Sequence, residues 1–180
     1  MVREMILDAA IDELKGANAS TFTLKRVAAR AGVEASTIQQ LWPNTPELFA
    51  ATIAFYASRH LPVVPDTGTL YGDLLEYATS YADMVNTPTG RRLLDSLIVR
   101  PSDWDVAGSR EAYIKSRHNW AAEIFQRGID RGECRPTTDA GRTIDSLTLS
   151  VCLPVLIYDR PVTVDDCEYA AKLVLRGICC

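Results

Sequence analysis

The sequence predicts an all-α protein of about nine helices: a three-helix helix-turn-helix head at the N-terminus and a helical-bundle body behind it. Apolar residues recur at helical spacing along most of the chain, and no segment alternates convincingly with a period of two. A stretch rich in proline and glycine separates the helix-turn-helix head with its connector helix (1–60) from a body (61–180). The breakers in this stretch are Pro62, Pro65 and Gly68.

Several of the expected helices are bounded by a capping residue or a breaker. Thr45 and Pro46 suit the cap and the first position of a connector helix. Thr163 suits the cap of the last helix, which has acidic residues in its first turn. In the head, helices are expected at residues 2–14, 24–31, 35–42 and 46–59. In the body they are expected at residues 70–85, 89–99, 106–131, 139–158 and 163–178.

Residues 23–48 have the pattern of a helix-turn-helix. Thr23 can cap the first short helix, and Gly32 permits the sharp left-handed turn that ends it. The second short helix has a polar outer side, while Ile38, Leu41 and Trp42 are expected to face the core. Two short helices joined by such a turn, the second with a polar outer side, are typical of proteins that read DNA in the major groove.

The same stretch resembles the DNA-binding domain of the tetracycline-repressor (TetR) family of bacterial regulators. The resemblance rests on V-A-x-x-A-G-V (27–33), S-T-I (36–38), the pair Trp42–Pro43 and E-L (47–48). It implies a transcriptional regulator, a ligand-responsive repressor, that binds a palindromic double-stranded DNA operator as a homodimer. It also implies a small apolar effector that binds within the body. No enzymatic activity is expected.

Three positions depart from the family's pattern. Gln39 stands where the family usually has Tyr, and Thr45 stands where it usually has Lys; both usual residues contact phosphates. Glu34 replaces the usual capping Ser and adds a negative charge. Because phosphate contacts supply much of the affinity for DNA, weaker or differently tuned binding is expected. An alternative is a helical small-molecule-binding protein of the same fold that has lost specific DNA binding.

The candidate DNA contacts lie in and around the second short helix. Its glutamine side chains can pair with adenine edges, and its hydroxyl side chains can touch bases or phosphates. The net charge of −4 does not argue against this, since residues 1–60 are neutral and the excess acid lies in residues 61–180. The candidates are Thr23, Lys25, Arg26, Ala35, Ser36, Thr37, Gln39, Gln40 and Thr45.

The body offers aromatic and polarisable side chains at helical spacing. Such residues are more often plain core than a ligand cage, but the resemblance implies an effector between the middle helices. The candidate ligand-binding residues are Tyr77, Tyr81, Met84, Trp104, Tyr113, Trp120 and Phe125. The resemblance also implies that the last two long helices pair with those of a second subunit, and the apolar run late in the body is what such a homodimer interface needs. Its candidate residues are Leu147, Val151, Val155 and Leu173.

Other functional classes lack the residues they need. His60 and His118 have no carboxylate or thiol at catalytic spacing, and we expect no cofactor and no metal site. Residues 146–158 are too short an apolar run to span a membrane and the start does not resemble a signal peptide, so a cytoplasmic protein without a membrane association is expected. The adjacent Cys179 and Cys180 leave a cysteine-based redox regulator open as a further alternative.

Overall fold

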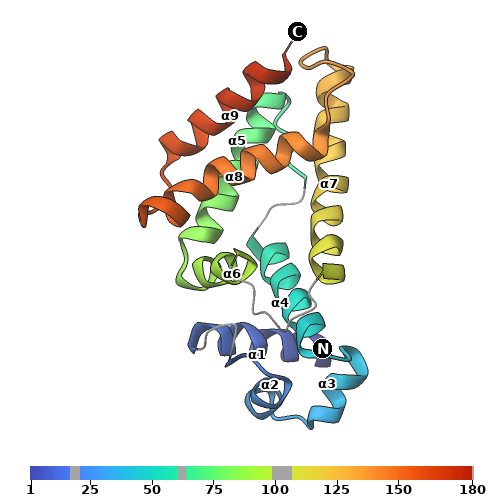
Figure 1. Cartoon of the computed structure of the whole chain (residues 1–180). Helices are drawn as coiled ribbons and strands as arrows, with labels where there is room; N and C mark the ends of the chain where they lie inside the picture. The colour runs from blue at the N-terminus through green and yellow to red at the C-terminus, as the bar shows by residue number, and fades with distance from the viewer. Residues whose placement is uncertain (17–20, 61–63, 99–106, 180) are drawn as a thin grey trace. The chain divides into compact units, whose positions relative to one another are not determined.

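A computed structural model describes residues 1–16, 21–60, 64–98 and 107–179 of the chain. These ranges contain nine α-helices and no strand (Figure 1), which confirms the predicted fold class. The helices are α1 (Val2–Gly16), α2 (Leu24–Ala31), α3 (Ala35–Leu41), α4 (Thr45–His60), α5 (Leu70–Asn86), α6 (Pro88–Ile98), α7 (Ala107–Asp130), α8 (Ala140–Tyr158) and α9 (Val164–Ile178).

The helices form two compact units. We call residues 1–59 and 87–113 the head unit, and residues 60–86 and 114–180 the body unit. The chain first passes from the head unit to the body unit at residue 60. The structure adds α6 to the head unit, because α6 packs on α1 and Arg92 of α6 donates a hydrogen bond to the carbonyl oxygen of Leu14.

Local capping explains where several helices begin and end. Thr23 Oγ1 accepts a hydrogen bond from the Arg26 N–H at 3.3 Å, and Gly32 ends α2 with φ 68° and ψ 30°. Thr163 and Asp166 form a reciprocal capping box at the start of α9. The expectation for α4 was wrong by one residue. Asn44 provides the cap, since its Oδ1 accepts from the Glu47 N–H at 2.9 Å, and Thr45 is the first helical residue.

The core of the head unit brings α1, α2, α3 and α4 together. Phe22, just before α2, packs edge to face on Phe49 of α4, with ring centroids 5.5 Å apart. Ile38 and Trp42 of the α3 segment are buried as expected. Leu41 is 44% exposed, which corrects the expectation that it faces the core. Ile38 and Trp42, four residues apart, fill the inner side of this short helix and leave Leu41 at its edge.

The core of the body unit is built around α5. This helix packs against both α8 and α9, and α8 packs against α9 (Figure 1). Asn86, at the end of α5, holds the connection between α8 and α9. Its side chain donates to the Val162 carbonyl oxygen at 2.9 Å and accepts from the Val162 N–H at 2.8 Å. The largest fully buried side chains here are Tyr77, Phe125, Leu70, Leu74, Ile124, Ile144 and Leu147.

Candidate functional site

The outer side of α3 carries the side chains that the sequence predicted to read DNA. Ser36, Gln39 and Gln40 are exposed, while Ile38 on the opposite side is fully buried. Ala35 and Thr37 are half-buried. Because α3 is held to α2 by the left-handed turn at Gly32, its polar side is presented on a short, rigid helix. This is the arrangement that places amide side chains against base edges in the major groove.

The remaining predicted DNA residues have different surroundings. Lys25 is exposed on the first turn of α2. Thr23 is exposed and its hydroxyl caps that helix, while Thr45 is half-buried at the start of α4. Arg26 is also exposed, but its guanidinium is in contact with the carboxylate of Glu13. A phosphate contact by Arg26 therefore competes with an ion pair that already exists within the head unit.

Sequence reasoning missed Glu13, which is the centre of this ion-pair cluster. Its side chain is only 3% exposed, and its two oxygens contact Arg26 and Arg30 of α2, the latter at 2.9 Å. The signal was present in the sequence. Glu13 lies three residues after Ala10 and seven after Ile6, both fully buried, so helical spacing places it on the inner side of α1. We call Glu13, Arg26 and Arg30 the α1–α2 ion cluster.

Three of the predicted ligand-binding side chains form an aromatic cluster in the body unit. The Tyr77 ring lies 5.8 Å from that of Tyr81 and 4.8 Å from that of Trp120, measured between centroids. The Tyr77 hydroxyl is 2.9 Å from Thr148 Oγ1 of α8. Trp120 is half-buried, and Tyr77 and Tyr81 are buried, as are two further predicted ligand residues, Met84 and Phe125. Trp104 and the side chain of Tyr113 lie outside the described part of the chain.

Polar groups on α7 and α8 adjoin one another in the same unit. The Asp145 carboxylate accepts from Arg117 through one oxygen and lies 3.0 Å from His118 Nε2 through the other. Burial raises the pKa of the Cys152 thiol to about 11, although a hydrogen bond with Tyr81 and the charge of Arg117 oppose the shift. Burial, with nearby acidic charges, also raises the pKa of Cys167 to about 11. These two thiols are therefore protonated at neutral pH and poor nucleophiles, whereas the redox alternative concerns Cys179 and Cys180 and stays a prediction.

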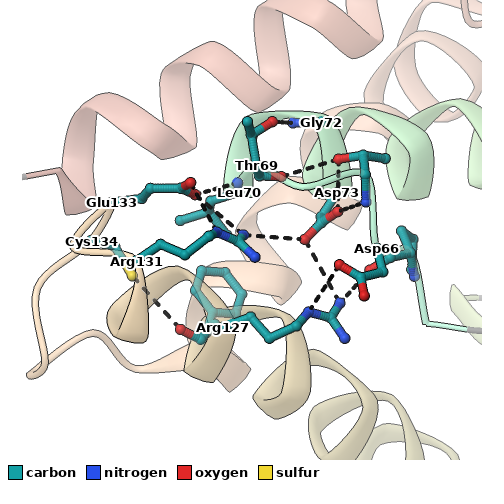
Figure 2. A network of polar contacts seen from close by, with 12 residues as sticks. Asp66, Thr69, Leu70, Gly72, Asp73, Arg127, Arg131, Glu133 and Cys134 are labelled. Atoms are coloured by element: carbon teal, nitrogen blue, oxygen red, sulfur yellow. Dashed lines mark hydrogen bonds and ion pairs between the residues drawn. The ribbon is translucent and has the colours of Figure 1, made fainter.

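A second polar network fastens the segment before α5 to the end of α7 (Figure 2). Asp73 is fully buried, and its Oδ1 accepts from the N–H and the hydroxyl of Thr67 at 2.6 and 2.8 Å. Its Oδ2 lies 3.7 Å from Arg127 and 3.6 Å from Arg131. Every carboxylate in this network faces an arginine or a backbone N–H. Within the described residues, no group of three or more His, Cys, Asp or Glu side chains is placed to hold a metal ion.

The predicted dimer residues divide between the core and the surface. Leu147, Val151 and Val155 are 0–6% exposed, so they belong to the core of the body unit and form no outward face. Leu173 of α9 is 51% exposed. On α8 the exposed apolar side chains recur every four residues along the sequence. Each of them follows a buried apolar residue by two positions. The exposed apolar face, as we call it, comprises Leu149, Leu153 and Ile157 of α8 with Tyr169 and Leu173 of α9.

Helix α8 has apolar side chains on its exposed side as well as on its buried side, which makes it unusually apolar. Within the described ranges it is the one helix long and apolar enough to cross a membrane by length and composition. Length therefore does not exclude a membrane span, contrary to the sequence-based expectation. The contacts of α8 favour a different role, because its other side packs against α5 and α9 in the core of the body unit.

Comparison with known proteins explains this combination of a helix-turn-helix and a helical body. The family described as "Tetracyclin repressor-like, C-terminal domain" matches residues 64–174, which is more than half of the chain. The chain belongs to the tetracycline-repressor family of transcriptional regulators.

Relatives match over nearly the whole chain. The HTH-type transcriptional regulator AqdR of Rhodococcus erythropolis is 29% identical over 97% of this chain and 84% of its own length. YdeS of Bacillus subtilis, an uncharacterised HTH-type transcriptional regulator, is also 29% identical, over 96% of this chain and 85% of its own. The crystal structure of the TetR-family regulator SCO0332 superposes with a TM-score of 0.77 at 29% identity, covering 99% of both chains. These relatives are regulators rather than enzymes.

Proposed function

We propose that this TetR-family regulator is a cytoplasmic, ligand-responsive repressor that binds a palindromic operator as a homodimer. The observation that carries the proposal is the outer side of α3, where Ser36, Gln39 and Gln40 are exposed. The inner side of the same helix packs in the head unit, where Ile38 is fully buried. Gln39 and Gln40 read adenine edges, and Lys25, Thr23 and Thr45 hold the phosphate backbone.

The homodimer supplies the two reading helices that a palindrome requires. Major grooves on one side of B-DNA recur about every 34–36 Å, so one head unit reads each half-site. The exposed apolar face of α8 and α9 supports this assembly, since a two-fold interface uses the same patch on both subunits. Exposed leucine, isoleucine and tyrosine side chains on two adjacent helices are also costly to leave in water.

The effector site is proposed at the aromatic cluster of the body unit. The proposal rests on the grouping of the Tyr77, Tyr81 and Trp120 rings, since aromatic side chains predominate in sites for apolar or aromatic molecules. The Tyr77 hydroxyl, 2.9 Å from Thr148 Oγ1, is proposed as the polar group of this site. Effector binding lowers the affinity for DNA through a coupling free energy of roughly 1–3 kcal/mol, and by reciprocity DNA lowers the affinity for effector. An effector that binds without changing DNA affinity would contradict this mechanism.

The test is a fluorescence-anisotropy titration with the duplex upstream of the protein's own gene, repeated across salt concentrations. We expect two subunits per site, a steep salt dependence and a preference for one short palindrome over a scrambled duplex. A variant with both Gln39→Ala and Gln40→Ala should lose the preference and keep the salt dependence. Lys25→Ala should weaken binding to both duplexes equally and reduce the salt slope by about 2, one for each subunit of the dimer.

Binding that is weak and indifferent to sequence at every salt concentration would refute the repressor. It would favour the alternative that the departures at Glu34, Gln39 and Thr45 have abolished specific DNA binding. The body unit would then be the functional part of the molecule.

A further inference from the structure

The α1–α2 ion cluster joins the first helix of the helix-turn-helix to α1 within the head unit. Arg26 and Arg30 lie four residues apart, so their side chains leave the same side of α2. Both guanidinium groups reach the same carboxylate, that of Glu13 on α1, one at each oxygen. The two arginines are about half exposed, at 53% and 45%, whereas Glu13 is 3% exposed.

The buried carboxylate is charged at neutral pH. Burial alone would raise the pKa of Glu13, but hydrogen bonds from Arg30 and Arg26, together with their charges, more than offset burial and hold this pKa below its ordinary value. Glu13 therefore cancels one of the two positive charges that α2 would otherwise present. It also fixes where both guanidinium groups lie, because each is held at one end by the carboxylate.

The pairing with Glu13 limits how Arg26 and Arg30 of α2 can bind the phosphates of DNA. Free arginines near a reading helix bind phosphates, which raises the affinity for every sequence equally. An arginine held by an internal carboxylate must break or share that contact before it can bind a phosphate. Its contribution to sequence-independent binding is then reduced, while the base contacts made by α3 are unaffected.

We propose that Glu13 is a positioning residue that restrains Arg26 and Arg30 and so limits sequence-independent DNA binding by the head unit. This inference rests on the proposed DNA-binding function and adds to it a residue that sets the electrostatic, sequence-independent part of the affinity. With Glu13 in place fewer phosphate contacts form, so the affinity for every duplex is lower and depends less steeply on salt.

The test is the Glu13→Gln variant in the full chain, measured for binding to a palindromic and to a scrambled duplex across salt concentrations. Glutamine keeps the size and one hydrogen-bond acceptor but removes the charge. The half-exposed arginines remain hydrated, so the fold should persist; far-UV circular dichroism and thermal unfolding check this. We expect the salt slope for the scrambled duplex to become steeper by about 2–4, because one or two arginines are released in each subunit of the dimer and each one that binds a phosphate adds about 1. Each such step enlarges the loss of affinity between about 50 and about 200 mM salt by about 3.5-fold.

The matched control is Asp8→Asn. Asp8 lies on the same helix α1 and pairs with Arg59 of α4, so this variant also removes one negative charge and releases one arginine in the head unit. Arg59 is outside the helix-turn-helix, and we expect Asp8→Asn to leave the salt slope at its wild-type value. A folded Glu13→Gln variant with the wild-type slope, or one that weakens binding to both duplexes, would overturn the proposal.

A second comparison does not depend on the folding of Glu13→Gln. If Glu13 restrains Arg26, then Arg26→Ala reduces the salt slope less than Lys25→Ala does, which lowers it by about 2 for the dimer. An equal reduction in the two variants would refute the restraint. Wild-type protein and Glu13→Gln that both fail to bind any duplex at low salt would refute the DNA-binding function and this inference together. Wild-type binding with an unchanged slope in Glu13→Gln would refute only the role of Glu13.

Discussion

The exposed apolar face makes a quantitative prediction about dimerisation. Leu173 is 51% exposed in one subunit, so about half of its side chain remains to be buried by a partner. Full burial of a leucine contributes about 1.5–3 kcal/mol, and the exposed half therefore about 0.75–1.5 kcal/mol. A two-fold interface buries the residue twice, which gives about 1.5–3 kcal/mol for the dimer. Leu173→Gln should raise the dimer dissociation constant about 10- to 150-fold.

The assay is sedimentation velocity over a range of protein concentrations, together with urea unfolding. Glutamine is a good helix former, so the unfolding free energy of the isolated Leu173→Gln subunit should change by no more than about 0.5 kcal/mol. The control is Leu147→Ala, which removes a fully buried side chain on α8 and should destabilise the subunit by about 2–5 kcal/mol. A dissociation constant within about twofold of wild type for Leu173→Gln would refute the assignment of this face as the dimer interface.

Three further predictions concern the body unit. Asn86→Ala removes both hydrogen bonds to Val162 and should lower the unfolding free energy by about 1–3 kcal/mol in urea denaturation. The hydrogen bond from Arg160 and those from Thr163 hold the pKa of Asp166 far below its usual range. The unfolded chain therefore takes up this proton first, and the stability that Asp166 contributes at neutral pH is lost as the pH falls below about 4. Cys152, with its pKa raised from 9.0 to about 11, should react with iodoacetamide at pH 8 at least about 100-fold more slowly in the folded protein than in urea.

Each of these has a control and an outcome that would contradict it. Asn86→Asp keeps the acceptor for the Val162 N–H but sets a carboxylate against the Val162 carbonyl, so it should restore little of the lost stability. Asp166→Asn should flatten the loss of stability between about pH 4 and about pH 2, and a profile equal to wild type would contradict the ion pair with Arg160. Half-buried Cys179 provides the internal reference for alkylation, and equal rates at Cys152 and Cys179 would contradict burial of Cys152.

The features that the sequence predicted well are local ones. The extents of the nine helices were anticipated to within a few residues, because apolar spacing and caps act over one or two turns. Thr23, Gly32 and Thr163 behave as predicted for the same reason, since each works on backbone groups three or four residues away. The start of α4 was missed by one position because Asn44 and Thr45 are both good capping residues, and only the geometry selects Asn44.

The exposed side of α3 was also predictable from the sequence. Its polar residues and its buried Ile38 lie on opposite sides of a short helix, and that division follows from helical spacing alone. The family motif in residues 27–48 pointed to the same segment, and the domain match over residues 64–174 is independent of it. Local pattern and overall family therefore agree on a DNA-reading head without help from long-range contacts.

What only the tertiary structure decided is which side of an apolar helix faces the core and which charges meet. Apolar residues occur on nearly every side of α8, so their periodicity does not show which of them are buried. Packing of α8 against α5 and α9 decides this: it buries Leu147, Val151 and Val155 and leaves Leu149 and Leu153 exposed. The grouping of α6 with α1 depends in the same way on contacts between residues more than seventy positions apart. The pairing of Glu13 with two arginines of the next helix follows the same rule, because helical spacing places Glu13 on the inner side of α1 but does not specify which side chains of α2 meet it.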